Sequence, residues 1–329
     1  MRIAVLFRTT DGPWGGGNSF LRALIRHWRA QHVEVVDHLE AGLDGVLLSS
    51  SYRGRLARLD PRAVERMVKY GTASALPSAL AWSRWRGGFR PPFVHRLDGV
   101  FRLYGRAAGD PADVAQLEIN RWVDWTIYQS EFCRESFAAE GADVSLSTVI
   151  VNGVDLDVFF PAQRTPPASP LKLIMVSWSP NLRKGAPAAV AASRLPDIEV
   201  TFIGNWPPGL EPERVKILSP LRHEALAERL RSHHAMLHMA ENDPCSNAIL
   251  EAMACGLPVV YHPSGGSPEI VAECGVPCAR GLSEALAQLR DRYGLLRDRT
   301  IARRLALSIA RPAGEYLSVF ERVGPVRSS

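Results

Sequence analysis

The segment from Glu241 to Val271 constrains the fold of this chain more strongly than any other part of its sequence. Asn247–Cys255 has the composition of a short helix, and Gly256 is a typical residue for ending one. An apolar run at Val259–Tyr261 then predicts a short buried strand. Gly265-Gly266 predicts a turn before the next helix. This alternation of helix, strand, turn and helix indicates an α/β domain.

Two carboxylates bracket the first part of this segment. Asp243 precedes the predicted helix, and Glu251 lies more than one turn inside it. Ser246 or Asn247 is the expected N-cap. The N–H groups at the helix start and the positive end of its dipole form an anion site. An anion site beside carboxylates, which bind hydroxyl groups, suits a sugar nucleotide. The alternative is an ordinary surface helix with Glu251 in solvent.

The same segment resembles the donor-binding signature of retaining GT-B glycosyltransferases of the family 4 type, the glycosyl transferases group 1. Their pattern places an acid and seven residues before E-A-M-A-x-G-x-P-V-V, which is followed by G-G-x-P-E. This chain has EAMACGLPVV at Glu251–Val260 and GGSPE at Gly265–Glu269. It departs at the first acid, where the family usually has Glu and the chain has Asp243, whose shorter side chain changes the reach toward the donor sugar.

The resemblance implies the GT-B fold, with two doubly wound, Rossmann-like α/β domains facing each other across a cleft. Residues 1–161 would bind the acceptor and residues 162–312 the nucleotide sugar, with a terminal helix at 313–329 packing back on the first domain. Strands and helices alternate through both halves, which predicts an α/β fold independently of the resemblance. The implied activity is retaining transfer of a sugar from a nucleotide-diphosphate sugar, in glycan, polysaccharide or glycosylated-metabolite biosynthesis.

The loop Trp178–Gly185 stands where the family carries G-R-x-x-x-x-K-G, whose Arg and Lys neutralise the departing diphosphate. Lys184 matches the family lysine, but Ser179 occupies the position of the Arg. Arg183 is the nearest substitute for the missing charge. The resemblance therefore assigns electrostatic stabilisation of the leaving group to Lys184 and Arg183. A solvated pair of loop cations is the alternative.

Further donor contacts follow from position in the same pattern. Gly15, Gly16 and Gly17 follow the predicted first strand and match the family's glycine-rich loop, although a flexible surface turn would look similar. In the resembling enzymes Glu251 would bind the ribose hydroxyls and Asp243 the hydroxyls of the donor sugar. The remaining candidates for donor binding are Ser179, Asn181, Gly204, Asn205, Leu221, Ser246, Asn247 and Ala248.

One further candidate lies in the first half. Phe93–Gly99 predicts a strand that runs into a loop, and polar residues follow such strands where open α/β sheets bind ligands. We expect Asp98 to contact the acceptor or the donor sugar, whereas His95 is as well explained as a core-edge histidine. A helix is predicted next, over Asp110–Trp125.

We expect no metal site and no cofactor, with the nucleotide-diphosphate sugar as co-substrate. The five cysteines form no CxxC pair and have no histidine at zinc spacing. Asp155 and Asp157 form a D-x-D sequence, but the surrounding TVIVNGVDLDVFFP resembles the family's interdomain linker. We therefore interpret this pair as part of a hinge and not as a metal site.

The segment from Arg53 to Arg90 holds nine basic residues and two acids, with Trp82, Trp85 and Phe89 among the last arginines. A polar, basic helix is predicted over Tyr52–Ala81. The pattern suits an anionic acceptor or a membrane surface, or else a solvated helix face. The net charge of +5 is nearly all arginine, and we expect no nucleic-acid partner. Without a cleavable signal pattern, the sequence predicts a cytoplasmic protein, with a peripheral position at the inner membrane surface as the further option.

Two rival functions share the fold. A sugar-nucleotide epimerase would need additional acids and a histidine near the sugar. A non-catalytic protein that binds sugar nucleotides would keep Glu251 but could lack the phosphate cations, and the absence of Arg at Ser179 keeps this alternative open.

Overall fold

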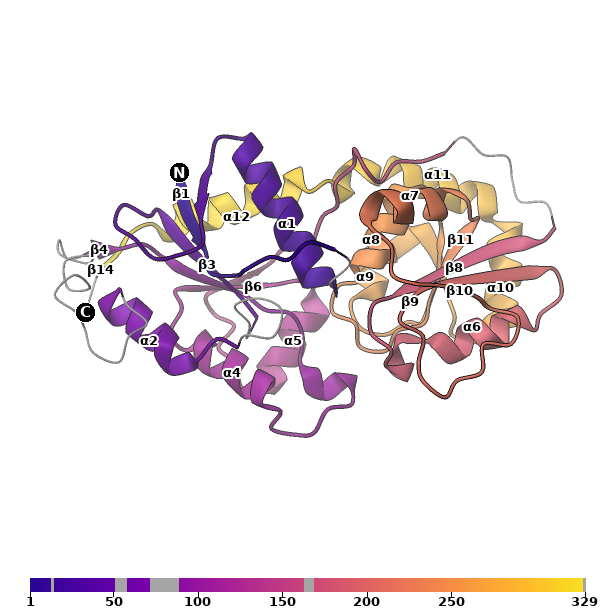
Figure 1. Cartoon of the computed structure of the whole chain (residues 1–329), viewed down its shortest axis with the longest axis horizontal. Helices are drawn as coiled ribbons and strands as arrows, with labels where there is room; N and C mark the ends of the chain where they lie inside the picture. The colour runs from indigo at the N-terminus through magenta and orange to yellow at the C-terminus, as the bar shows by residue number, and fades with distance from the viewer. Residues whose placement is uncertain (13–14, 51–57, 72–88, 163–168, 328–329) are drawn as a thin grey trace. The chain divides into compact units, whose positions relative to one another are not determined.

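The computed structural model describes residues 1–12, 15–50, 58–71, 89–162 and 169–327, and these form two compact units (Figure 1). The first unit comprises Met1–Thr10, Leu21–Val151 and Pro312–Ser329. The second comprises Asp11–Phe20 and Asn152–Arg311. The segment Asn152–Pro161, which we expected to close the first domain, is grouped with the second unit. There Val154 forms a parallel bridge with Ser308, and Arg304 donates to the carbonyl oxygen of Leu156.

The first unit is built on a six-stranded parallel sheet. Figure 1 shows helices on both of its faces, and β3 is accordingly buried along its whole length. In sheet order the strands are β2 (Glu34–Val36), β1 (Arg2–Val5), β3 (Gly45–Ser49), β5 (Phe93–Arg96), β6 (Trp125–Tyr128) and β7 (Ser147–Val149). The helices are α1 (Gly15–Ala30), α2 (Pro61–Tyr70), α4 (Pro111–Asn120), α5 (Glu131–Ala139) and α12 (Ala310–Val323).

Two predicted helices are shorter in the structure. The helix predicted over Asp110–Trp125 is α4, which ends at Asn120 because the chain turns there to enter β6. The side chain of Asn120 donates to Thr126 Oγ1 across this turn (2.8 Å). Within the predicted helix Tyr52–Ala81, the structure has α2, which begins after the Asp60 N-cap; residues 51–57 and 72–88 lie outside the described residues.

The terminal helix packs in the first unit through Trp28 of α1. The indole Nε1 of Trp28 donates to the carbonyl oxygen of Ala313 (3.0 Å), and its ring makes an edge contact with Tyr316. The helix was predicted over 313–329, but α12 ends at Val323 because Gly324 adopts a positive φ of 63°. The chain then forms β14 (Val326–Arg327), which pairs antiparallel with β4 (Phe89–Arg90).

The second unit repeats the architecture with a second six-stranded parallel sheet. Its strands, in sheet order, are β10 (Lys216–Leu218), β9 (Ile198–Gly204), β8 (Leu171–Ser177), β11 (Ala235–His238), β12 (Val259–Tyr261) and β13 (Gly275–Pro277). Its helices are α6 (Ala186–Ser193), α7 (His223–Arg231), α8 (Asn247–Ala254), α9 (Ser267–Val271), α10 (Leu282–Asp291) and α11 (Tyr293–Ala302). The short 3₁₀ helices of this unit are η2 (Leu182–Lys184), η3 (Ala272–Cys274) and η4 (Arg304–Leu307), and η1 (Phe101–Tyr104) belongs to the first unit.

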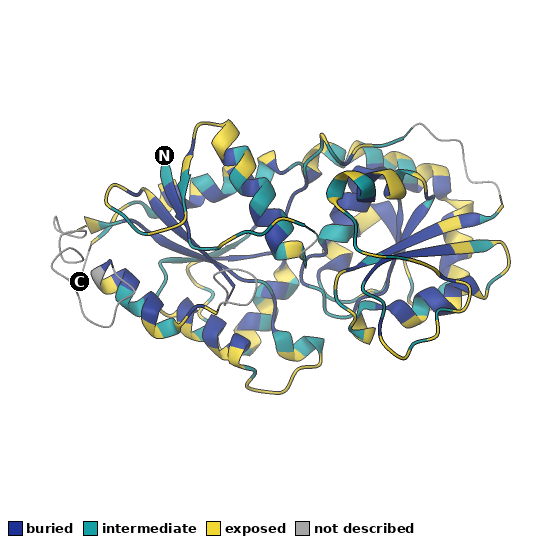
Figure 2. Ribbon diagram, viewed as in Figure 1, coloured by how far each residue is buried: buried dark blue, intermediate teal, exposed yellow. Residues whose placement is uncertain are grey.

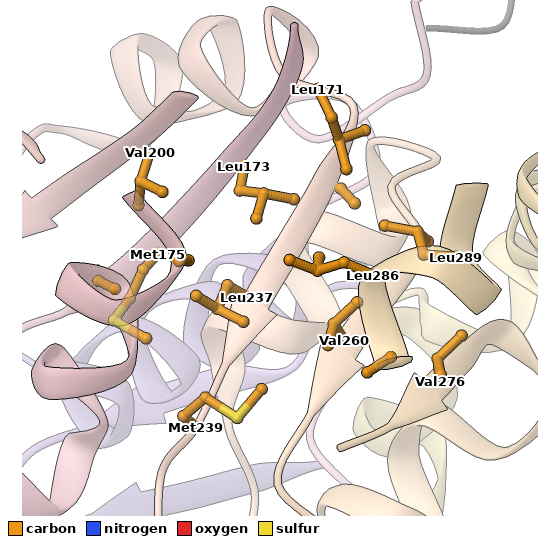
Figure 3. Packing of buried hydrophobic residues seen from close by; sticks show 14 of the residues in the cluster. Leu171, Leu173, Met175, Val200, Leu237, Met239, Val260, Val276, Leu286 and Leu289 are labelled. Atoms are coloured by element: carbon orange, nitrogen blue, oxygen red, sulfur yellow. The ribbon is translucent and has the colours of Figure 1, made fainter. Parts of the chain in front are cut away.

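The order of the strands in the second unit determines where a ligand can bind. Successive strands extend from β8 in one direction to β10, and from β11 in the other direction to β13. The direction of winding therefore changes between β8 and β11, and open α/β sheets bind ligands at the carboxyl ends of the strands at such a point. Aliphatic and methionine side chains of these strands and of α10 fill the core beneath, including Leu173, Leu237 and Leu286 (Figure 3).

Burial follows the expected layering in both units. The central strands are buried along most of their length, the edge strands β2, β7 and β10 are less buried, and most helices are buried on one side and exposed on the other (Figure 2). Among the residues that the structure describes, no helix combines the length and the apolar character needed to cross a bilayer.

The packing of α12 on the first sheet can be tested at Gly45, where a Cβ atom would lie 2.3 Å from the ring of the buried Phe320. We expect Gly45→Ala to lower the free energy of unfolding by about 1–3 kcal/mol because the ring has no room to move. Gly314→Ala is the matched control: its Cβ would meet nothing within 4 Å, and alanine in a helix should stabilise by about 0.5–1 kcal/mol. Urea unfolding measures both, and equal stability of Gly45→Ala and the parent would contradict the packing.

Candidate functional site

The second unit contains a pocket at the change in winding direction, between the carboxyl ends of β8, β9 and β11 and the N-terminus of α8. Every residue that lines it belongs to this unit. Of the residues predicted from the sequence, the lining includes Gly15, Gly16, Ser179, Lys184, Gly204, Leu221, Asp243, Ser246, Asn247, Ala248 and Glu251. Gly17, Asn181, Arg183 and Asn205 are not part of the lining, and Asp98 belongs to the first unit.

An ion pair between Lys184 and Asp243 lies at the centre of the predicted chemistry. Nζ of Lys184 donates to Oδ2 of Asp243 at 2.7 Å, and both side chains are largely buried. Burial by itself would raise the pKa of Asp243, but the Lys184 ammonium, together with His238 and the backbone N–H of Cys245, holds that pKa below its usual value. The pocket therefore contains a fixed positive charge and an ionised carboxylate at neutral pH.

Two glycines of the sequence pattern allow this pair to form. Gly185 follows Lys184 with a φ of 94°, and a Cβ there would lie 2.6 Å from that of Met239. Gly265 has a φ of 67°, and its Cβ would lie 2.4 Å from the carbonyl oxygen of Asp243. A side chain at Gly185 would push the loop that carries Lys184 away from Met239, and a side chain at Gly265 would displace the backbone of Asp243. Close packing of the backbone thus explains why glycine follows Lys184 and why Gly265 stands in the glycine pair of the pattern.

Helix α8 presents its N-terminus to the pocket. Ser246 caps the helix, with its Oγ accepting from the N–H of Ile249 at 3.4 Å. The first N–H groups of a helix, here those of Asn247 and Ala248, have no acceptor within the helix. Together with the helix dipole they favour an anion. The expected N-cap is therefore present, and it leaves N–H groups available beside Lys184.

Glu251 also lines the pocket, but its state differs from that of Asp243. Its side chain is buried, and within the described ranges it has no hydrogen-bond or ion-pair partner. Burial raises its pKa to about 8, so the carboxyl group is mostly protonated at neutral pH. A buried carboxyl group without a partner can bind hydroxyl groups of a ligand as donor and as acceptor. The alternative of a solvated Glu251 is wrong.

The predicted loop residues outside the lining hold the loop in shape. Asn181 caps η2 by accepting from the N–H of Arg183 (3.0 Å), and Asn205 donates to the carbonyl oxygen of Trp178 (2.6 Å). The guanidinium of Arg183 pairs with Glu241 at 3.2 Å, where both side chains are about half exposed. The structure therefore gives Arg183 a surface partner instead of a place in the pocket lining, and its role toward a diphosphate stays a prediction.

The predicted glycine-rich loop is part of a helix, because α1 begins at Gly15 and includes Gly16 and Gly17 in its first turn. The carbonyl oxygen of Gly16 accepts from Nδ2 of Asn247 (2.7 Å). Oδ1 of Asn247 accepts in turn from Asn152 (2.9 Å). The side chain of Asn247 is thus engaged with the protein, and its N–H remains the group that a ligand would meet.

In the first unit, Asp98 follows β5 within a buried polar network. Arg96 is fully buried and donates to Asp98 and to Gln129, each at 2.7 Å. His95 Nε2 lies 2.8 Å from the carbonyl oxygen of Ser50, and burial lowers the pKa of His95 to about 4. His95 is therefore a neutral core histidine that supports the strand end. Asp98 remains partly exposed and keeps its predicted role in ligand contact as a prediction.

The structure adds residues to the pocket that the sequence did not single out, chiefly Trp178, His223 and His238. His238 had a sequence signal, because it directly follows the apolar run Ala235–Leu237, and open α/β sheets bind ligands where such strands end. The other two lie on a loop and at a helix start, where no pattern in one sequence marks them.

Within the part of the chain that the structure describes, no three His, Cys, Asp or Glu side chains group as metal ligands would. In the D-x-D sequence, Oδ1 of Asp155 accepts from the N–H of Asp157 (3.0 Å), as in an Asx turn. Metal independence itself stays a prediction.

Comparison with known proteins places the pocket in a family context. The family model described as glycosyl transferases group 1 matches residues 176–292. The GDP-mannose-dependent alpha-mannosyltransferase of Mycolicibacterium smegmatis is 28% identical over 184 residues, 46% of either chain. The D-inositol 3-phosphate glycosyltransferase of Mycobacterium tuberculosis is 30% identical over 160 residues, 42% of this chain and 33% of the relative. The chain thus spans less than half the length of these curated relatives.

Solved structures resemble the chain over nearly its full length. Sucrose-phosphate synthase from Thermosynechococcus elongatus has a TM-score of 0.69 at 17% identity, covering 98% of each chain. Anabaena Alr3699/HepE in complex with UDP and glucose has a TM-score of 0.65 at 18% identity, covering 97% of this chain and 99% of that one. At such identities the likeness concerns the fold, and it confirms the predicted GT-B architecture of two Rossmann-like units.

The buried carboxyl group of Glu251 generates a pH-dependent prediction. Its raised pKa means that, above pH 4.5, the unfolded chain loses this proton while the folded protein keeps it until about pH 8. Each pH unit in that window should lower the free energy of unfolding by up to about 1.4 kcal/mol. Glu251→Gln removes the titration and should therefore exceed the parent in thermal stability, by a margin that grows from pH 5 to pH 8.

Glu228→Gln, at an exposed position of α7, is the matched control and should show no such trend. A Glu251→Gln margin that is constant with pH, or that shrinks as the pH rises, would contradict the buried, protonated state.

Proposed function

We propose that this protein is a glycosyltransferase that transfers a sugar from a nucleotide-diphosphate sugar to an acceptor with retention of anomeric configuration, and the match of the glycosyl transferases group 1 model to residues 176–292 supports this proposal. The observation that carries the proposal is the convergence of Lys184, the N-terminus of α8 and two acids of opposite protonation state in one pocket. A cation and helix N–H groups suit a diphosphate, and the acids suit the hydroxyl groups on either side of it.

Lys184 acts on the leaving group. When the bond between sugar and diphosphate breaks, negative charge grows on the diphosphate, and a fixed cation stabilises that state more than the ground state. The ion pair with Asp243 holds Lys184 in the pocket before the donor binds. Bound diphosphate then competes with Asp243 for the ammonium. The carboxylate of Asp243 remains available to accept hydrogen bonds from hydroxyls of the donor sugar.

Glu251 binds the ribose. It lies one turn into α8 and therefore beyond the N–H groups that would face the diphosphate. Its buried carboxyl group lacks a partner among the described residues, and a pair of ribose hydroxyls would satisfy it. A ligand that forms hydrogen bonds with a previously unpaired buried polar group gains binding free energy from them.

The proposed acceptor contacts lie in the first unit. Asp98 is held by Arg96 and presents a partly exposed carboxylate. The basic and aromatic composition of residues 53–90 supports an anionic or membrane-associated acceptor. In this proposal the enzyme is cytoplasmic. Most of that segment, including Trp82 and Trp85, lies outside the described residues.

A second candidate function is supported by one observation. Ser179 replaces the family arginine, and Arg183 pairs with Glu241 instead of lining the pocket. A protein that binds sugar nucleotides without transferring the sugar needs no second cation on the leaving group. Steady-state kinetics distinguish the two functions. A thermal-shift screen of UDP, GDP and ADP first identifies the base, because a ligand that binds only the folded state raises apparent stability.

Lys184→Ala should lower kcat by about 10²–10³-fold and raise the donor KM less, because its charge matters most in the transition state. Arg183→Ala should have a much smaller effect, since its guanidinium already has a surface partner. Lys216→Ala, at an exposed position of β10, is the matched control and should retain parental kinetics.

Removing Lys184 also leaves Asp243 unpaired, so Asp243→Asn provides the second control. It should bind the nucleoside diphosphate at least as tightly as the parent, because it frees Lys184 and removes a negative charge, while sugar transfer falls. Near-normal kcat in Lys184→Ala would overturn the leaving-group assignment and favour the binding function.

Transfer should also survive chelation, because no metal-ligating cluster exists among the described residues. We expect equal turnover with and without EDTA. Turnover that is lost in EDTA and restored by Mn²⁺ would show that the Asp155 and Asp157 carboxylates, or others, hold a required metal.

A further inference from the structure

His238 closes β11 and lines the same pocket, but neither the sequence pattern nor the proposed chemistry gives it a role. Only 5% of its surface is exposed. Its Nε2 atom is fully buried and, among the residues that the structure describes, has no hydrogen-bond partner. A buried polar nitrogen without a partner destabilises the folded state, because it has lost water and gained nothing in return.

The backbone of β11 fixes the position of this ring. The carbonyl oxygen of His238 accepts from the N–H of His262 at 2.9 Å, and His238 is paired in register with Tyr261 of β12. The strand end therefore holds the ring against the pocket. Nε2 itself is enclosed in the empty pocket, and rotation of the ring about its Cβ–Cγ bond would turn it toward a ligand whose matching group satisfies it.

The charges nearest to His238 indicate which part of the donor it would meet. Burial lowers the pKa of His238 to about 4; the carboxylate of Asp243 opposes that shift and the ammonium of Lys184 adds to it. The ring is therefore neutral at pH 7 and lies close enough to sense both members of the ion pair. A neutral imidazole has one N–H donor and one acceptor.

We propose that His238 is a donor-binding residue whose Nε2–H donates a hydrogen bond to the terminal phosphate of the nucleoside diphosphate, the phosphate that carries the sugar. This assignment rests on the proposed function, in which Lys184 meets the diphosphate and Asp243 meets the sugar. His238 lines the same pocket, and the charges of Lys184 and Asp243 both act on it. It therefore lies where the diphosphate and the sugar of the donor join. A phosphate oxygen only accepts hydrogen bonds, and it would fix the ring in the Nε2–H tautomer.

Three variants separate a ligand contact from a structural role. His238→Leu removes the polar atoms at similar volume, His238→Asn is polar but too short to reach the Nε2 position, and His238→Gln places an amide N–H near it. UDP, GDP and ADP, with UMP, GMP and AMP, are titrated calorimetrically into each variant and the parent. We expect the Leu and Asn variants to bind the preferred diphosphate about 10- to 100-fold more weakly, with monophosphate affinity unchanged and the Gln variant largely restored.

His233→Leu is the matched control. His233 is similarly buried in the same unit, but its ring nitrogens lie within hydrogen-bonding distance of Thr201 Oγ1 (2.9 Å) and the carbonyl oxygen of Arg229 (2.7 Å). Its replacement should lower the melting temperature without changing the ratio of diphosphate to monophosphate affinity. His238→Leu should instead melt at or above the parental temperature in the absence of nucleotide, because it removes an unsatisfied group.

The outcomes distinguish this inference from the function on which it rests. A parent that binds none of the nucleotides overturns both. A parent that binds a diphosphate, with unchanged affinity in the Leu and Asn variants, overturns only the role of His238. Equal loss of diphosphate and monophosphate affinity would also overturn the terminal-phosphate contact. If His238→Leu does not fold, His238→Asn decides by the same comparison.

Discussion

The ion pair between Lys184 and Asp243 joins the loop after β8 to the segment after β11. β8 and β11 are the neighbouring strands between which the winding of the sheet changes direction. Gly185 lets the loop that carries Lys184 approach Met239, and Gly265 leaves room for the backbone of Asp243. The parallel sheet thus sets where the pocket opens, and the glycines set how tightly its charges are held. A pocket without this pair would keep the fold but lose its fixed cation.

Burial gives the pocket a charge balance that suits an anionic ligand. Asp243 stays ionised beside Lys184, whereas Glu251, equally enclosed but without a cation, has a pKa raised to about 8 and stays protonated. Burial lowers the pKa of His238 to about 4, so its imidazole is neutral at neutral pH. The charges of the empty pocket therefore nearly cancel at neutral pH, and the N-terminus of α8 adds a partial positive charge. A diphosphate entering this pocket meets less repulsion than the two acids in the sequence would suggest.

The sequence predicts local structure well where a few residues decide it. The Ser246 cap and the strand Val259–Tyr261 follow from punctuation by glycine, proline and small polar residues. The placement of Lys184, Asp243 and Glu251 in one pocket was implied by the family resemblance, and the structure has it. The sequence predicts less where tertiary contacts decide. The side chain of Arg183 turns to Glu241, fifty-eight residues away, and no local rule shows this. The position of His238 at the end of an apolar strand places it near the ligand-binding edge, but only the structure reveals that one of its buried nitrogens lacks a partner among the described residues.

The replacement of the family arginine by Ser179 has an electrostatic consequence. Ser179 stands where the resembling enzymes carry an arginine, and among the described residues Lys184 is the only lysine or arginine in the pocket lining. One cation, shared with Asp243, cannot by itself neutralise all the charge that grows on a departing diphosphate. The remaining stabilisation must come from neutral donors: the first N–H groups of α8, the hydroxyl of Ser246 and the imidazole of His238. Fixed dipoles in a buried site need no reorganisation when charge develops, so they can replace a second cation in part.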